Sequence, residues 1–475
     1  MSHHTNPAFL PDDSGVKRTT TTNGFSDDKN HFSNSHQIEM KNFNKAKEAL
    51  NDYDPFLHRQ VDHPTTNSET LLHFLKGCLG TGILAMPKAF YHSGYLVGII
   101  ATVLIGGICT YCIHMLIRAE YELCKRRKVP SLTYHEVAEI AFLEGPPKVQ
   151  KYSIYAKHAV NIFLLIYQLG ICCVYVVFIG TNVKSVCDTY FPEMSVSIYM
   201  LMFLLPLILI NWVRNLKRLA PFCTAANVIT LIGYAIIFYY IIRNKPSFDN
   251  RSPTGQYDHF PLFFGTVLFS LEAIGVIMPL ENEMKSPKNF ARPFGVLNIG
   301  MGLVVSIYLI MGLLGYLSYG ADVEPAITLN LPPDDILAQV VKVSLALSIY
   351  VTHALQCYVA VDITWREYIG PKLEKSSRAM LWEYVLRTAL VVITFLMAVA
   401  VPKLDLFISL FGAFCLSAAG LAIPAAVDSF TFWYSREGTV FYLTLTKNIL
   451  LVLFGIAGLI AGTYTSLKEI IEQLL

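Results

Sequence analysis

The chain has few charged residues for its length. Asp, Glu, Lys and Arg make up 15% of its 475 residues, whereas a typical soluble domain contains about 25%. Hydrophobic residues make up 53%, and the formal net charge at pH 7 is only +2. This composition predicts an integral membrane protein surrounded by the lipid bilayer, and the small net charge gives no reason to expect a nucleic-acid partner.

The sequence also lacks a disulfide framework and the residue clusters of an enzyme. Of the ten cysteines, nine fall in or beside apolar runs or in connections assigned below to the cytoplasm, and only Cys187 approaches the outer side. Cys109 and Cys112 lie inside one apolar run, where they are interpreted as small packing residues. The apolar runs show no metal-ligand cluster and no nucleophile–base pair, so we expect no enzyme activity, no bound metal and no cofactor.

Residues 1–68 contain too few apolar side chains to form a core. The segment is rich in Ser, Thr, Asn, Asp and His, a composition typical of disordered regions. It also lacks the charged and then apolar arrangement of a cleaved signal peptide. We therefore predict a disordered cytoplasmic N-terminal tail over 1–68 and a transmembrane domain over 69–475.

Apolar runs of about 18 residues or more, each long enough to cross a bilayer, fill most of the remaining chain. We predict eleven transmembrane helices, near residues 71–91, 94–121, 156–186, 196–213, 222–243, 261–281, 294–317, 336–363, 384–401, 406–430 and 441–465. Segment 131–144 mixes apolar and polar residues and is predicted to form a short amphipathic helix within a connection.

The distribution of Lys and Arg over the connections predicts the orientation. The connections after the second, fourth, sixth and eighth runs are rich in them, as in Lys125-Arg126-Arg127-Lys128, whereas none occurs from Leu317 to Val341. Because short basic connections stay in the cytoplasm, we place these connections and the N-terminus there. The pattern Asn250-Arg251-Ser252 then lies outside, where Asn250 is a candidate for glycosylation.

The first run carries glycines and a proline that weaken a continuous helix. Lys76-Gly77-Cys78-Leu79-Gly80-Thr81-Gly82 precedes Pro87. In lipid every freed backbone group needs a partner, so an interrupted helix must face protein or a watery cavity. The amides of Gly80, Thr81 and Gly82, followed by the N-terminus of a half-helix, are suited to bind a carboxylate. The alternative is that these glycines serve only close helix packing.

The sixth run has the same features and adds a carboxylate. Gly275 and Pro279 follow the segment Ser270-Leu271-Glu272-Ala273-Ile274. A charge near the bilayer centre costs at least about 2.5–3.5 kcal/mol, so Glu272 is expected to face a cavity or a partner. A protonated Glu272 that only bonds a neighbouring helix is the alternative.

Five spans separate the starts of the two interrupted runs. Because five is odd, a repeat of five begins again on the opposite side of the membrane, and the two halves are related by a pseudo-two-fold axis in the membrane plane. We therefore predict inverted repeats over about 69–243 and 261–430, with an extra helix at about 441–465. Interrupted helices at the start of both repeats indicate a substrate site near the middle of the membrane.

Several segments together resemble one known family, namely residues 69–82, 168–175, 214–216, 257–266, 279–285 and 327–331. They are similar to the proton-coupled amino acid transporters of the amino acid/auxin permease group, in particular to its insect branch, and the resemblance covers roughly residues 65–470. It implies an all-α, five-plus-five inverted-repeat (LeuT-like) fold. It also implies symport of protons with small neutral amino acids such as alanine, glycine and proline.

The resemblance implies roles for individual residues. A proton-linked histidine begins the first span in this family, and His73 occupies that position; Glu272, as a buried carboxylate, is the second candidate proton carrier. The implied substrate contacts are at the two interrupted segments: Gly80, Thr81, Gly82, Ser270, Glu272, Ala273 and Ile274. The chain departs from the usual family residues at Cys78, Ala85, Leu271 and Ala273.

Four polar residues in other runs are further candidates for lining a cavity. Gln168 and Tyr175 are seven residues apart and share a helix face, so they either line a cavity or bond a neighbouring helix. Thr352 and His353 lie in the eighth run. Sodium-coupled relatives of this fold hold Na⁺ with hydroxyls of that span, and Thr352 supplies one such hydroxyl. His353 is a candidate to pair with a polar group across the bundle.

Three functions remain open at this stage. A proton-coupled symporter is the leading hypothesis. The first alternative is an amino acid sensor of the same fold, which would signal growth through nutrient-signalling partners of its N-terminal tail. The second alternative is a sodium-coupled transporter. A channel is disfavoured because no pore motif is repeated. Both the plasma membrane and the lysosomal membrane offer a suitable proton gradient.

Overall fold

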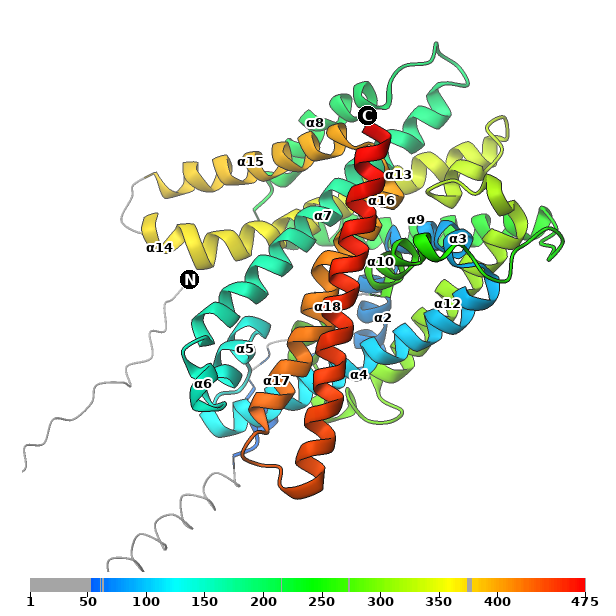
Figure 1. The fold of residues 1–475 in the computed structure, drawn as a ribbon. Helices are drawn as coiled ribbons and strands as arrows, with labels where there is room; N and C mark the ends of the chain where they lie inside the picture. The colour runs from blue at the N-terminus through cyan, green and yellow to red at the C-terminus, as the bar shows by residue number, and fades with distance from the viewer. Residues whose placement is uncertain are drawn as a thin grey trace, which may run out of the picture. The chain divides into compact units, whose positions relative to one another are not determined.

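Helices make up the regular structure of the protein. The computed structural model describes residues 53–59, 61, 64–214, 216–271, 274–373 and 378–474. Within these ranges the regular elements are helices, apart from one isolated backbone bridge between Thr65 and Met284. The predicted all-α fold is confirmed, and Figure 1 shows the helices assembled into a bundle.

Nine helical segments of the described chain are long and apolar enough to cross a membrane. They are α4 (Tyr95–Arg127), α7 (Ser153–Cys187), α9 (Leu216–Arg243), α10 (Phe260–Leu271) with α11 (Ile274–Asn282), α12 (Val296–Tyr319), α13 (Ile336–Thr364), α15 (Ala379–Ala400), α16 (Leu404–Phe411) with η7 (Gly412–Ala422) and α17 (Ile423–Thr431), and α18 (Gly438–Leu474). Helix α8 (Val196–Asn211) is apolar but shorter. The count of eleven stays a prediction.

The first apolar run forms two short helices, as its glycines predict. Helix α2 (Asn67–Cys78) begins with a capping box in which the Thr66 hydroxyl accepts from the Glu69 amide and the Glu69 carboxylate accepts from the Thr66 amide. Helix α3 (Gly82–Ser93) begins four residues after α2 ends. The interruption falls at residues 79–81, within the segment for which sequence analysis predicted it.

The sixth run likewise forms two described helices: α10 ends at Leu271, and α11 begins at Ile274. Residues 272–273 between them lie outside the described residues, so the predictions for Glu272 and Ala273 receive no structural account. The predicted inverted repeat also stays a prediction.

Short helices occupy the connections. Helix α5 (Tyr134–Leu143) falls within predicted segment 131–144 and packs against α7 and α17, with the Tyr134 hydroxyl donating to the Ala419 carbonyl at 2.6 Å. The other short elements are α6 (Pro147–Gln150), η2 (Tyr257–His259), η3 (Pro287–Asn289), η4 (Gly320–Asp322), η5 (Ile327–Asn330), η6 (Trp365–Ile369) and α14 (Gly370–Leu373).

Helix α7 occupies the middle of the bundle. It packs against α13, α15, α16 and α8, while α3 packs against α10 and α12. Helix α18, red in Figure 1, runs beside α17 and η7 and leaves most of its apolar surface exposed. The half-helices α3 and α10 are therefore enclosed by other helices, which is the environment that an interrupted helix needs in lipid.

Part of the segment predicted as a tail lies against the helices. Residues Pro55–Leu57 form the 3-10 turn η1. The Thr65 amide donates to the Glu283 carbonyl and the Lys285 amide donates to the Thr65 carbonyl, both at 2.9 Å. Residues 1–52, 60 and 62–63 lie outside the described residues, so the prediction of disorder over 1–68 is not addressed there.

Arg59 ties this N-terminal segment to α4 and α11. Its Nη1 lies 2.8 Å from Glu281 Oε2, its Nη2 lies 3.6 Å from Glu120 Oε1, and its Nε donates to the Pro130 carbonyl at 3.0 Å. The Arg59 side chain is only 6% exposed and both carboxylate side chains are 1% exposed. The ends of the second and sixth spans are thus joined through a buried charge cluster.

Candidate functional site

A cavity of about 320 Å³ lies beside the interruption of the first span. Its lining comes from α2, α3, α5, α7, α10, α11 and α13. Seven residues predicted as substrate-binding or cavity-lining contribute to it: Gly80, Thr81, Gly82, Gln168, Tyr175, Ser270 and Ile274. Three segments that are far apart in the sequence are therefore brought together around one cavity.

Tyrosine hydroxyls from two other helices hold the interrupted backbone in place. The Tyr308 hydroxyl of α12 donates to the Cys78 carbonyl, and the Tyr234 hydroxyl of α9 donates to the Gly80 carbonyl at 2.9 Å. Breaking the helix frees these carbonyls, and an unpaired carbonyl would be costly at this depth. The first N–H groups of a helix lack acceptors one turn earlier. Here the Gly80 amide donates to the Cys78 carbonyl at 2.9 Å and the Leu84 amide donates to the Thr81 carbonyl at 3.1 Å, so the amides of Thr81 and Gly82 are the donors that a ligand in the cavity would meet.

Glycine is required where the two interrupted spans meet. A Cβ atom at Gly82 would lie 2.8 Å from both Cα and Oγ of Ser270. This approach is closer than side chains allow, so any other residue would push α3 and α10 apart. The Ser270 hydroxyl donates to the Thr266 carbonyl at 2.7 Å. Its oxygen keeps acceptor capacity for a ligand amine.

Four buried polar atoms around the cavity lack a hydrogen-bond partner within the described structure: Thr81 Oγ1, Asn161 Oδ1, Asn161 Nδ2 and Asn282 Oδ1. Buried polar atoms are almost always paired. A polar ligand or water molecules in the cavity would satisfy these donors and acceptors.

Helices α7 and α13 contribute polar side chains to the cavity lining. The Gln168 amide nitrogen of α7 donates to the Gln356 side-chain oxygen of α13. Gln356, Val359 and Ile363 recur at helical spacing and turn one face of α13 toward the cavity. The Tyr175 hydroxyl lies 3.6 Å from the position that a Cβ of Gly80 would take.

Ionisable groups gather where α5 and the end of α13 reach the cavity. His135 and Asp362 contribute to the lining. Glu367 Oε1 lies 3.5 Å from His135 Nε2, and its Oε2 lies 3.2 Å from the Lys157 ammonium. Burial lowers the pKa of His135 below its usual value, although the Glu367 carboxylate opposes this shift. This burial favours the neutral imidazole, which is able to accept as well as donate a hydrogen bond.

The remaining predicted residues lie elsewhere. His73 is on the exposed face of α2 and Asn250 is exposed in the connection after α9 with φ of 56°. The Thr352 hydroxyl donates to the Ser348 carbonyl at 2.9 Å. His353 is fully buried, with Nδ1 3.2 Å from the Asn211 amide nitrogen of α8. Neither Thr352 nor His353 contributes to the cavity lining, because the helix turns His353 toward α8 and bonds Thr352 to its own backbone.

Several polar lining residues were not predicted from the sequence, among them Asn161, Asn282, Gln356, His135 and Asp362. A signal was present for Asn161, because it precedes Gln168 by seven residues and so shares the face of α7 that Gln168 and Tyr175 occupy. No comparable spacing signal marks Asn282 or Gln356, since their relation to the cavity depends on how α11 and α13 pack.

Replacing Tyr234 by phenylalanine tests whether the tyrosine hydroxyls stabilise the interruption. The change leaves the Gly80 carbonyl without this donor, so we expect the free energy of unfolding to fall by about 1–3 kcal/mol. Tyr239→Phe is the matched control, because Tyr239 lies on the same helix, is 52% exposed and makes no hydrogen bond within the described structure. Denaturant titration of both purified proteins in detergent measures the difference, and equal stabilities would contradict this role.

A family model described as "Transmembrane amino acid transporter protein" matches residues 63–468. The chain belongs to this family. The match spans the interrupted helices, the residues that line the cavity and the described helical segments that are long enough to cross a membrane, except for the last residues of α18. The protein is therefore a multi-pass membrane transporter of amino acids rather than an enzyme, as the resemblance predicted.

The chain is also similar to two named relatives and to one solved structure. The chain is 42% identical over 426 residues to the Drosophila melanogaster "Proton-coupled amino acid transporter-like protein pathetic", covering 89% of each chain. It is 27% identical over 425 residues to the Caenorhabditis elegans "Probable amino acid transporter skat-1", covering 86% of this chain and 91% of the relative. It is also similar to the structure of Mhp1, a nucleobase-cation-symport-1 family transporter, in a closed conformation with bromovinylhydantoin bound. The TM-score of this comparison is 0.49, the sequence identity is 12%, and the match covers 88% of this chain and 93% of that chain.

Proposed function

We propose that this family member is a secondary active symporter of protons and small neutral amino acids of the alanine, glycine and proline class. The observation that carries the proposal is the cavity at the interruption between α2 and α3, where exposed backbone groups and unpaired polar side chains line the space. Its volume of about 320 Å³ lies at the small end of the range for ligand pockets. The relative at 42% identity is named as proton-coupled.

An amino acid zwitterion carries a carboxylate and an ammonium group, and each has a proposed contact in this cavity. Its carboxylate is placed at the segment Gly80, Thr81 and Gly82, where the N-terminus of α3 adds its positive dipole end. The Gly80 amide already donates to the Cys78 carbonyl at 2.9 Å, so the contacts fall mainly to the amides of Thr81 and Gly82. Its ammonium is placed near Ser270 Oγ and the backbone around Ile274 at the second interruption. Small side chains are favoured because Tyr175 and Phe269 enclose the space beside the interruption.

We further propose the orientation predicted from Lys and Arg, with the N-terminus and even-numbered connections in the cytoplasm. The cavity lining that comes from α5 and the end of α13 then lies toward the cytoplasm. We also propose that residues of about 69–243 and 261–430 form two inverted repeats, and that the N-terminal tail is cytoplasmic. The protein works at the plasma membrane or the lysosomal membrane, where an acidic compartment supplies protons.

Transport by the purified full-length protein in liposomes tests the proposal. We expect radiolabelled alanine, glycine and proline to accumulate when the outside is at pH 5.5 and the inside at pH 7.5, and to accumulate much less when both are at pH 7.5. Replacing sodium by choline should leave this difference intact. Binding without flux would favour the amino acid sensor instead, and accumulation driven only by sodium would favour a sodium-coupled transporter.

His73 and Glu272 are the proposed proton carriers, and their substitutions should differ in effect. Glu272→Gln resembles the protonated, neutral form, so we expect it to retain exchange of labelled for unlabelled substrate while losing proton-driven accumulation. His73→Ala should also lose accumulation against a gradient. Exchange and net uptake measured side by side in liposomes separate these outcomes. Concentrative uptake at the wild-type level in both variants would show that other groups carry the proton.

A further inference from the structure

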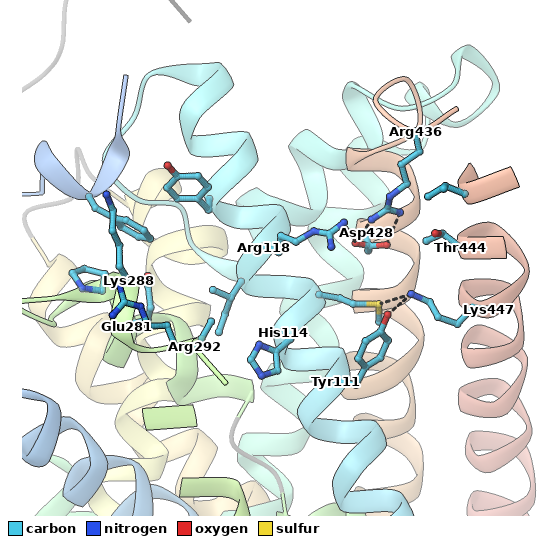
Figure 2. A pocket seen from close by; sticks show the side chains of 17 residues that line it. Tyr111, His114, Arg118, Glu281, Lys288, Arg292, Asp428, Arg436, Thr444 and Lys447 are labelled. Atoms are coloured by element: carbon cyan, nitrogen blue, oxygen red, sulfur yellow. Dashed lines mark hydrogen bonds and ion pairs between the residues drawn. The ribbon is translucent and has the colours of Figure 1, made fainter. Parts of the chain in front are cut away.

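A second cavity, of about 740 Å³, lies away from the transport site between α4, the segment around η3, and α17 and α18. Figure 2 shows cationic side chains on two of its walls: Arg118, Arg436 and Lys447 on one and Lys288 and Arg292 on the other. Its lining also includes aromatic and aliphatic side chains, such as Tyr111, Ile117 and Val440.

The carboxylates at this cavity are already neutralised. Asp428 accepts from Arg436 at 2.9 and 3.0 Å and from the Asn448 amide at 2.8 Å. Glu281 lies 2.8 Å from the Arg59 guanidinium, which is outside the lining. Both carboxylates of the lining therefore already have a cationic partner, which for Glu281 is an arginine shared with Glu120.

Three cations keep most of their charge available. Arg118 reaches Asp428 only at 3.9 Å, and its side chain is 61% exposed. Lys447 contacts the Tyr111 hydroxyl and the face of its ring, both uncharged. In the part of the chain that the structure describes, Arg292 and Lys447 form no ion pair. An anionic ligand with more than one negative charge would balance this cluster.

An apolar surface continues from the cations along the outside of the bundle. Val440 and Leu443 of α18 are 63% and 67% exposed, and Tyr111 of α4 is 43% exposed. Both helices are long and apolar enough to cross a membrane, so these side chains face acyl chains. The cations and the apolar surface together match an amphiphile that lies in the membrane, rather than a water-soluble anion.

We propose that this cavity binds an anionic phospholipid whose headgroup carries phosphate monoesters. The phosphates would lie between Arg118, Lys447 and Arg292, and the acyl chains would follow α18. A phosphodiester alone brings one negative charge, whereas each monoester adds close to two, which suits cations on two walls of a wide cavity. In the proposed orientation this cavity lies at the cytoplasmic side, and basic cavities between helices on that side are a known setting for such headgroups.

Titration of the purified full-length protein in neutral detergent tests the proposal. The probes are dioctanoyl phosphatidylinositol bisphosphate, dioctanoyl phosphatidylserine, dioctanoyl phosphatidylcholine and the water-soluble inositol trisphosphate, and the readout is the thermal unfolding temperature. We expect a saturable rise with the bisphosphate lipid that is larger than with the other three probes. An equal rise with inositol trisphosphate would show a soluble-anion site and overturn the lipid, and an equal rise with either other lipid would overturn the headgroup.

Substitution locates the site. Arg118→Gln combined with Lys447→Gln should weaken binding of the bisphosphate lipid about tenfold or more, because two headgroup contacts are lost. Lys148→Gln combined with Lys372→Gln is the matched control: it removes the same charge from exposed residues outside this lining. Equal affinity in the two double variants would overturn the assignment. Each variant's unfolding temperature without lipid shows whether it folds.

Discussion

Replacing Gly82 by valine is expected to abolish amino acid uptake while the amount of folded protein changes much less. The Cβ of any residue at this position would lie 2.8 Å from Ser270 Cα, so α3 and α10 would have to separate locally at the site. The β-branched side chain would also cover the amides at the start of α3 that are proposed to meet the substrate carboxylate. Uptake in liposomes, together with size-exclusion chromatography of the purified variant, measures both effects.

Gly302→Val is the matched control for this substitution. Gly302 lies in α12, and no atom is within 4 Å of the position that its Cβ would take. The same change of residue type there should leave uptake near the wild-type level. Loss of uptake in both variants would point to a general cost of valine in these helices, and normal uptake by Gly82→Val would remove this segment from the site.

Arg59→Met is expected to destabilise the protein by about 3–5 kcal/mol, because it leaves the buried carboxylates of Glu281 and Glu120 without their cation. Arg127→Met provides the comparison. Arg127 also pairs with a carboxylate, Glu144 at 2.8 Å, but its side chain is 41% exposed, and exposed pairs contribute about 0–1 kcal/mol. Denaturant titration in detergent gives both free energies of unfolding.

A second substitution separates charge from packing in this cluster. Adding Glu281→Gln and Glu120→Gln to Arg59→Met removes the uncompensated charges, so much of the lost stability should return. If Arg59→Met costs no more than Arg127→Met, the buried cluster does not hold the N-terminal segment to α4 and α11. If the triple variant is no more stable than Arg59→Met, packing rather than charge explains the loss.

The interruption of the first span could be predicted from sequence because its cause is local. Gly80 and Gly82 weaken the helix by themselves, and no distant residue is needed to see this. The residues that make the interruption tolerable are distant: Tyr234 and Tyr308 donate to its carbonyls from helices more than 150 positions away. Nothing in the sequence around either tyrosine marks this partnership.

The lining of the cavity could be predicted only in part for a similar reason. Gln168 and Tyr175 were identified because their spacing places them on one face of α7, and the structure puts both at the cavity. Thr352 and His353 could not be placed by spacing, since the packing of α13 decides which face meets the cavity. Arg59 lies in a segment whose composition resembles a tail, yet its buried ion pairs come from residues of α4 and α11.

The most direct test of proton-coupled symport is the substrate-evoked current in cells that expose the protein at their surface. We expect alanine to evoke an inward current that grows as the external pH falls from about 7.5 to about 5.5, a range that spans the ordinary pKa of histidine. We also expect this current to persist when choline replaces sodium. A current that vanishes without sodium, or one that does not change with external pH, would contradict proton coupling.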